Sequence, residues 1–176
     1  MTRIAILKTG APPPALTGRH GDYPAMFGTL LGAGYETAVF DSQAGEWPDA
    51  AAFDAAIITG SSAGVYEPEP WMIPPAATVA IPVSHQDQVV ERPPQARVIL
   101  CSDFTPLAGL AWDDDAVSLQ GHPEFTPAYA ADLTGGRRER MGAAVVDPAL
   151  ETLTQPDDRA LVGEWLRQFI VTRARR

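Results

Sequence analysis

The order of apolar segments in the first third of the chain constrains the fold most. Residues 4–7 form a short apolar run typical of a buried parallel strand. Apolar residues at helical spacing predict a helix over 23–33, and strands are predicted over 35–40 and 53–59. The last strand runs into a glycine-serine loop at 60–64. This order predicts an open α/β sheet, in which ligands bind at the carboxyl ends of the strands.

The middle of the chain predicts short strands. Strands are expected over 79–83 and 96–101 because both segments are rich in β-branched or other apolar residues. Two further strands, 110–112 and 116–119, flank an acidic turn and predict a hairpin.

Two helices are predicted near the carboxyl end of the chain. Thr126 is expected to be the N-cap of a short helix that extends to residue 133. Asp157 or Asp158 is expected to cap a final helix over 160–173. The expected buried stripe of this final helix consists of Leu161, Trp165, Leu166, Phe169 and Ile170.

Composition limits the class of protein. A chain of 176 residues predicts a single domain over 1–176. Its net charge of −9 disfavours binding to nucleic acids or anionic membranes. One cysteine allows no intrachain disulfide and fits a reducing compartment. No run of about 18 apolar residues, the length that a membrane span needs, is present. The sequence therefore predicts a cytoplasmic protein.

A histidine and a glutamate two residues apart form the clearest chemical motif. His122 and Glu124 follow directly on the strand predicted over 116–120, and Pro123 stiffens the backbone between them. In extended geometry, residues two apart project to the same side. We therefore expect the Glu124 carboxylate to orient the His122 ring, which leaves the other ring nitrogen as a base. By itself, such a short motif more often marks a loop histidine without chemistry.

The segment that contains His122 and Glu124 is the last of four short segments that together form a longer sequence pattern. They are Thr59-Gly-Ser-Ser62, Ser84-His-Gln-Asp-Gln-Val89, Ser102-Asp-Phe-Thr-Pro106 and Gly121-His-Pro-Glu-Phe125. Together they resemble the class I glutamine amidotransferase family, specifically its GMP-synthase-like free-standing branch. The resemblance implies a flavodoxin-like fold, with an open, mostly parallel sheet flanked by helices. It also implies hydrolysis of the glutamine side-chain amide to glutamate and ammonia through a Cys-His-Glu triad.

The resemblance assigns roles by position in the matched segments. His122 matches the base and Glu124 its orienting acid. The implied substrate is glutamine or a γ-glutamyl compound, and a synthetase or other ammonia acceptor is the implied partner; no cofactor and no metal are implied. The implied substrate-positioning residues are Gly60 and Ser61 of the oxyanion hole, and Ser84 and His85 of the glutamine-binding segment.

The nucleophile of the family has no counterpart in this sequence. The family carries it in a Gly-x-Cys-x-Gly turn on a central strand. Here residues 67–73 resemble the start of the helix that precedes this strand, but residues 74–78 run straight into the later strand at 79. The missing helix, strand and following elements amount to about 50 residues, which predicts an internal deletion near 73–79. Cys101 lacks flanking glycines and is expected to be a semi-buried structural cysteine. Without the central nucleophile strand, we expect the chain to be inactive.

Other interpretations remain open at this stage. The chain is alternatively an inactive binding module or a truncated remnant of the amidotransferase fold. A metal site formed by His85, Asp87, His122 and Glu124 is a further alternative, as is a flavodoxin-like mononucleotide binder. The loss of a central strand leaves unpaired edges, so we also expect self-association or low stability.

Overall fold

The structure is a computed structural model that describes residues 1–60, 79–85, 87–102, 104–113 and 115–173. The chain separates into two compact units. One unit combines Met1–Ser62 with Pro123–Arg176, and the other consists of Ala63–His122. Below, these are called the first unit and the second unit, and each is described by itself.

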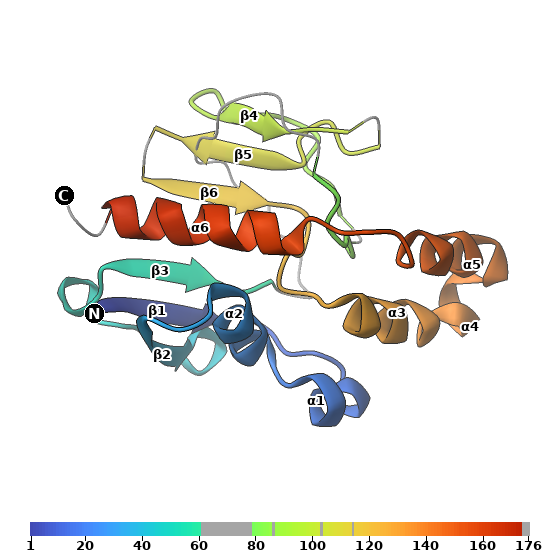
Figure 1. Ribbon diagram of the computed structural model, residues 1–176, viewed down its shortest axis with the longest axis horizontal. Coiled ribbons are helices and arrows are strands. Elements are labelled where there is room, and N and C mark those ends of the chain that lie inside the picture. Colours follow the sequence, from blue (N-terminus) through green and yellow to red (C-terminus); the bar gives the residue numbers. More distant parts are fainter. Residues whose placement is uncertain (61–78, 86, 103, 114, 174–176) are drawn as a thin grey trace. The chain divides into compact units, whose positions relative to one another are not determined.

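A three-stranded parallel sheet forms the centre of the first unit (Figure 1). Its strands are β1 (Thr2–Lys8), β2 (Tyr35–Asp41) and β3 (Ala55–Ile58), in the order β2-β1-β3. Both pairings with β1 are parallel. The central strand β1 is the most buried of the three, as its apolar run predicts. The predicted strands over 4–7, 35–40 and 53–59 are confirmed, with small shifts of their ends.

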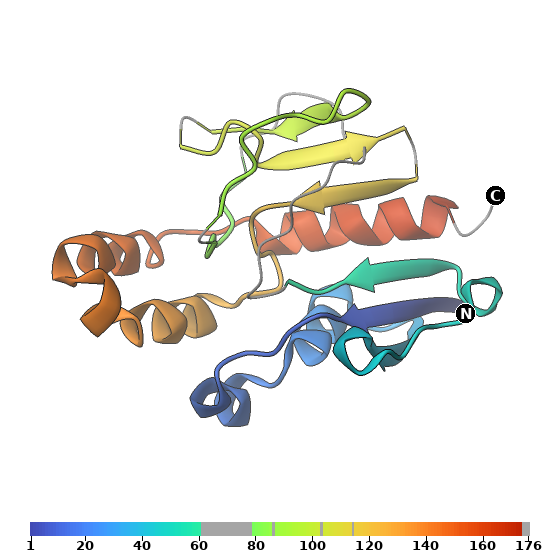
Figure 2. The ribbon, with the colours of Figure 1, turned by 180° about the vertical axis from the view of Figure 1, so that it is seen from behind.

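Helices α2 (Tyr23–Leu31) and α6 (Arg159–Arg173) cover one face of this sheet (Figures 1 and 2). Ile4 of β1, Leu31 of α2 and Ile170 of α6 form one buried cluster. The two helices approach closely at Gly163, where an added Cβ would lie 2.8 Å from the Leu30 Cδ1 atom. A larger side chain at this position would push α6 away from α2.

The predicted buried stripe of α6 is wrong at Leu161. Its side chain is exposed, whereas the neighbouring Val162 is buried. The face of the helix that meets α2 is centred on Gly163. Because glycine has no side chain, a pattern of hydrophobic residues does not identify this position as part of the buried face. Ile170, two turns further along, lies on this buried face as predicted.

The starts of two helices agree with the sequence. Thr126 Oγ1 accepts a hydrogen bond from the Tyr129 amide (3.1 Å), which confirms Thr126 as the N-cap of α3 (Pro127–Gly135). The Asp157 carboxylate accepts from the Arg159 amide (3.0 Å) at the start of α6. The remaining helical segments of the first unit are α1 (Pro14–His20), η1 (Ser42–Ala44), η2 (Ala50–Ala52), α4 (Arg138–Met141) and α5 (Ala143–Thr152).

A second buried cluster joins three helices of the first unit. Leu16 of α1, Met26 of α2 and Tyr129 of α3 belong to it, together with Phe125 and Leu133. The Phe125 and Tyr129 rings meet edge to face, with centroids 4.6 Å apart. This cluster fixes the segment before α3, and with it Glu124, against α1 and α2.

The second unit contains an antiparallel sheet in the order β4-β5-β6. Its strands are β4 (Arg97–Leu100), β5 (Gly109–Trp112) and β6 (Ala116–Leu119). The predicted hairpin is confirmed, and Asp113 at its turn has a positive φ of 46°, which aspartate tolerates better than most residues. The predicted strand over 79–83 is wrong: only Val83 pairs there, through an isolated bridge to Gly121, and Pro82 has no N–H to donate.

We expect the cluster beneath α2 and α6 to carry much of the stability of the first unit. Replacement Leu31→Ala should lower the free energy of unfolding by about 2–5 kcal/mol, because it empties a buried site. Leu31 is 2% exposed, whereas Leu161 on α6 is 59% exposed. The matched control Leu161→Ala should change the free energy of unfolding by less than about 0.5 kcal/mol. Urea unfolding measures both, and equal effects would contradict this packing.

Candidate functional site

The carboxyl edge of the parallel sheet positions Gly60, one of the two residues predicted for the oxyanion hole. The Thr9 amide donates to Thr59 Oγ1 (3.1 Å), and the Thr9 hydroxyl donates to the Thr59 carbonyl oxygen (2.6 Å). Thr59 is buried, and its own amide donates to the Leu7 carbonyl oxygen at 3.0 Å. Gly60 therefore leaves the sheet from a fixed point at this edge. Ser61, its predicted partner in the oxyanion hole, lies outside the described residues.

A charged pair lies at the same edge of the sheet. Lys8 ends β1 and Asp41 ends β2, and their Nζ and Oδ2 atoms are 2.6 Å apart. The Asp41 carboxylate also accepts from the amides of Gln43 (3.1 Å) and Ala44 (3.3 Å). The hydrogen bond from Lys8 lowers the pKa of Asp41, and the same bond raises the pKa of Lys8.

This pair predicts a pH dependence of stability. Because the pKa of Asp41 is lower in the folded chain than its ordinary 3.8, its contribution is complete above that pH and is lost as the pH falls through the folded value. The stability difference between wild type and Asp41→Asn should therefore shrink as the pH falls below 3.8. Chemical unfolding from pH 7 to pH 2 measures it, with Glu139→Gln on α4 as the control. If the stability difference between wild type and Asp41→Asn stayed constant over this pH range, the ionisation of Asp41 would not contribute to stability as expected.

The second unit brings His122 next to the segment that carries Ser84 and His85. The His122 amide donates to the Pro82 carbonyl oxygen at 2.7 Å, beside the bridge between Val83 and Gly121. An added Cβ on Gly121 would lie 2.5 Å from the Ile81 Cδ1 atom, so only glycine fits this approach without a shift. His85 Nε2 lies 3.4 Å from Gln88 Oε1. Two of the predicted segments are thus neighbours within one unit.

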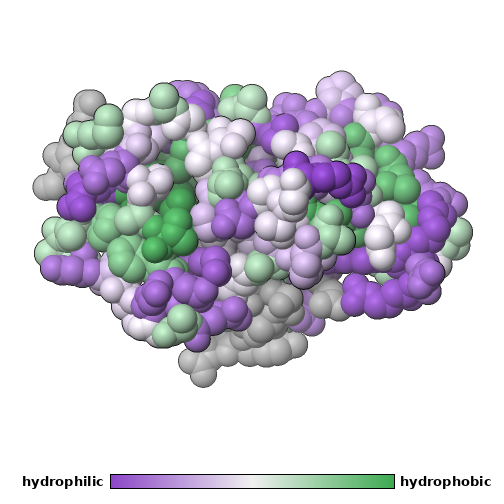
Figure 3. Space-filling model, turned by 90° about the horizontal axis from the view of Figure 1, so that it is seen from below, coloured by the Kyte–Doolittle hydropathy of each residue, from purple (hydrophilic) through white to green (hydrophobic). Residues whose placement is uncertain are grey.

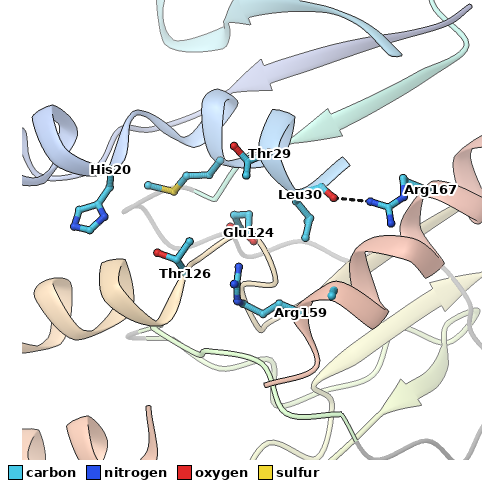
Figure 4. A pocket seen from close by; sticks show the side chains of 9 residues that line it. His20, Thr29, Leu30, Glu124, Thr126, Arg159 and Arg167 are labelled. Atoms are coloured by element: carbon cyan, nitrogen blue, oxygen red, sulfur yellow. Dashed lines mark hydrogen bonds between the residues drawn. The ribbon is translucent and has the colours of Figure 1, made fainter. Parts of the chain in front are cut away.

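Glu124 belongs to the first unit, where it is 6% exposed. Its side chain lines a cavity of about 300 Å³ between α1, α2, α3 and α6 (Figure 4). The division between the two units falls between His122 and Pro123. The pairing of His122 with Glu124 stays a prediction. The cavity is lined by His20, Met26, Thr29, Leu30, Glu124, Thr126, Arg159, Ala160 and Arg167.

His20 also lines this cavity, although it belongs to none of the motifs singled out from the sequence. It is the last residue of α1, and its side chain is 14% exposed. His20 Nε2 lies 2.7 Å from Asp132 Oδ2 on α3, and Arg19 Nη1 lies at the same distance from that oxygen. The His20 ring meets the Tyr129 ring edge on, and burial raises the pKa of the Tyr129 hydroxyl. Pro14 at the first position of α1 was the available signal for this helix.

Cys101 is exposed, which contradicts the expected semi-buried position. It follows directly on β4 of the antiparallel sheet, and its thiol is free. The ladder of β4 ends at Leu100, so the next side chain leaves the packed surface. The apolar sequence that ends in Cys101 does not show that the pairing of β4 with β5 stops at Leu100, so the exposure of Cys101 could not be predicted.

The alternative of a metal site gains no support from the structure. Within the ranges that the structure describes, no group of three or more histidine, cysteine, aspartate or glutamate side chains is arranged to hold a metal ion. Among the described helices, none is long and apolar enough to span a membrane.

Comparison with known proteins identifies no relative. The chain matches no protein-family model, no curated protein and no solved structure.

Proposed function

We propose that this chain is a glutamine amidotransferase-like domain without glutaminase activity. The observation that supports the likeness best is the burial of Glu124 in the His-Pro-Glu motif, two residues after His122 and two before the N-cap of α3. A carboxylate is rarely this buried unless a specific partner or function holds it there. The resemblance assigns Glu124 the role of the acid that orients the base, which His122 matches.

The fold is part of the same proposal. We assign the three parallel strands to a flavodoxin-like sheet of the amidotransferase type that has lost its central nucleophile strand. The order β2-β1-β3, with α2 and α6 on one face, is compatible with this assignment. Ile58 on β3 is 66% exposed, as expected if a strand that once covered it is missing. The deletion near 73–79 falls mostly outside the described residues.

The local setting of Cys101, directly after antiparallel strand β4, differs from that of the family's nucleophile. A thioester forms only when a thiolate lies within about 3–3.5 Å of the amide carbon, beside a base and an oxyanion hole. Cys101 is the one cysteine of the chain and follows an antiparallel strand. The oxyanion-hole loop of the proposal instead follows parallel strand β3 at Gly60.

We expect no glutaminase turnover from the purified chain. An assay for glutamate and ammonia should match the no-enzyme control, and a glutamine-analogue electrophile should leave the intact mass unchanged. The variant Cys101→Ser distinguishes turnover by Cys101 of this chain from turnover by a contaminating enzyme. Turnover that disappears in Cys101→Ser would show that Cys101 is the nucleophile and would refute the proposal of inactivity.

Glutamine binding separates a binding module from a truncated remnant. If the domain retains its substrate site, calorimetry should detect binding of glutamine or a γ-glutamyl compound. Ser84→Ala and His85→Ala should weaken that binding, and Ser118→Ala on β6 is the control. Absence of binding would favour the remnant. A synthetase partner and a cytoplasmic location belong to the proposal and rest on the resemblance and on composition.

Self-association is a further part of the proposal. Figure 2 shows the face of β1 and β3 that lies opposite α2 and α6, which neither of these two helices covers. Ile57 of edge strand β3 packs on the side of α2 and α6, so the next residue, Ile58, projects to the opposite face, where it is exposed. Figure 3, a view from below, shows hydrophobic areas among hydrophilic ones on the surface. Such an edge offers unpaired backbone groups to another strand.

Light scattering tests this expectation. The wild-type chain should form dimers or larger species at micromolar concentration. Ile58→Lys should shift the population toward monomers, since a charge on an exposed edge strand blocks pairing. Val145→Lys on α5, another exposed apolar position, is the control and should have no such effect. A monodisperse wild-type monomer would contradict the expectation.

A further inference from the structure

The cavity of the first unit contains an arginine to which the proposed amidotransferase likeness gives no role. Arg159 is the first residue of α6, and its side chain is three-quarters buried, at 24% exposure. Its one described ion pair is with Asp157, at 3.2 Å from Nε, and Nε itself is buried without a hydrogen bond. A guanidinium offers five N–H donors, and among the described residues the ion pair with Asp157 is the contact that the Arg159 side chain makes, so most of these donors can serve a ligand.

A second donor faces the same space. Thr126 Oγ1 accepts the amide hydrogen of Tyr129, which leaves the hydroxyl hydrogen of Thr126 to donate elsewhere. Both residues line the cavity, and Figure 4 shows the Arg159 guanidinium directed toward the side on which Thr126 and Glu124 lie. Two donors at one end of a cavity fit the oxygens of an anion.

The other arginine of the cavity has a structural role instead. Arg167 Nη1 donates to the carbonyl oxygens of Leu30 (2.8 Å) and Leu31 (3.2 Å) at the end of α2. Its Nη2 donates to Glu164 at 2.6 Å. These bonds hold α6 against α2 and use the donors of Arg167. Of the two arginines that line the cavity, Arg159 is therefore the one whose N–H groups can donate hydrogen bonds to a ligand.

Glu124 supplies an acceptor in the same cavity. A carboxylate has about four lone-pair positions, so it accepts a ligand hydrogen bond in addition to its contacts within the protein. The cavity volume of about 300 Å³ lies at the small end of ligand pockets. These features select a small molecule that combines an anionic group with a hydrogen-bond donor.

We propose that this cavity binds a small hydroxy- or amino-substituted carboxylate. Its carboxylate oxygens accept from Arg159 and Thr126, and its hydroxyl or ammonium group donates to Glu124. The inference shares Glu124 with the proposed amidotransferase likeness but does not depend on it. The test therefore varies Arg159 and leaves Glu124 unchanged, so that the two proposals can fail separately.

Titration of the full chain with lactate and acetate tests the site. Ionic strength is held constant with sodium chloride, and binding is followed by calorimetry and by amide chemical shifts. Lactate should bind saturably and at least fivefold more tightly than acetate, because only lactate has a hydroxyl to donate to Glu124. Shifts should concentrate on residues around Thr126 and Arg159.

Substitution of the arginine provides the decisive comparison. Arg159→Gln should weaken lactate binding at least tenfold, while Arg138→Gln, on the exposed helix α4, should leave it unchanged. If Arg159→Gln fails to fold by circular dichroism, Arg159→Lys keeps the charge and should still lose several-fold affinity, because lysine cannot bind both oxygens in a fork. Non-saturable responses, or equal responses in wild type and the Arg159 variants, would overturn the proposal.

Discussion

The burial of β1 beneath α2 and α6 is the interaction on which the first unit depends. β1 pairs in parallel with β2 along its whole length and with β3 over Ile4–Leu7, so its central residues have hydrogen-bonding strands on both sides. Its residue Ile4 then meets Leu31 and Ile170, which come from the two covering helices. Because α2 and α6 approach each other at Gly163, they form one layer of helices that packs on one face of the sheet. The carboxyl edge of the sheet and the cavity around Glu124 both take their positions from this packing.

Local chemistry allowed several elements to be predicted from the sequence. Thr126 before Pro127 is a sufficient helix start because the cap needs only one hydroxyl and the amide three residues on. The hairpin of β5 and β6 follows from two apolar runs around an acidic turn. The parallel strands follow from apolar runs that contain β-branched residues. In each case the determining atoms lie within a few residues of one another.

The errors arose where distant parts of the chain decide the outcome. Leu161 has the right residue type for a core, but the contact of Gly163 with Leu30 turns it outward. The expected site shows the same limit. The order of Gly60, Ser84, His122 and Glu124 along the chain predicts one site, but the structure describes Gly60 and Glu124 in one unit and Ser84 and His122 in the other.

The contact between Ile4 and Ile170 also affects how the chain folds during synthesis. The ribosome makes β1 before every other described element and α6 after all of them. Until α6 emerges, the apolar face of β1 lacks one of its two covering helices, and the closing contact spans almost the whole chain. Contacts of such long sequence separation slow folding, because the entropy of closing the loop must be lost before the contact forms. Until α6 has been made, this face of the sheet is covered by α2 alone, and partly covered apolar surface of this kind makes folding intermediates prone to associate.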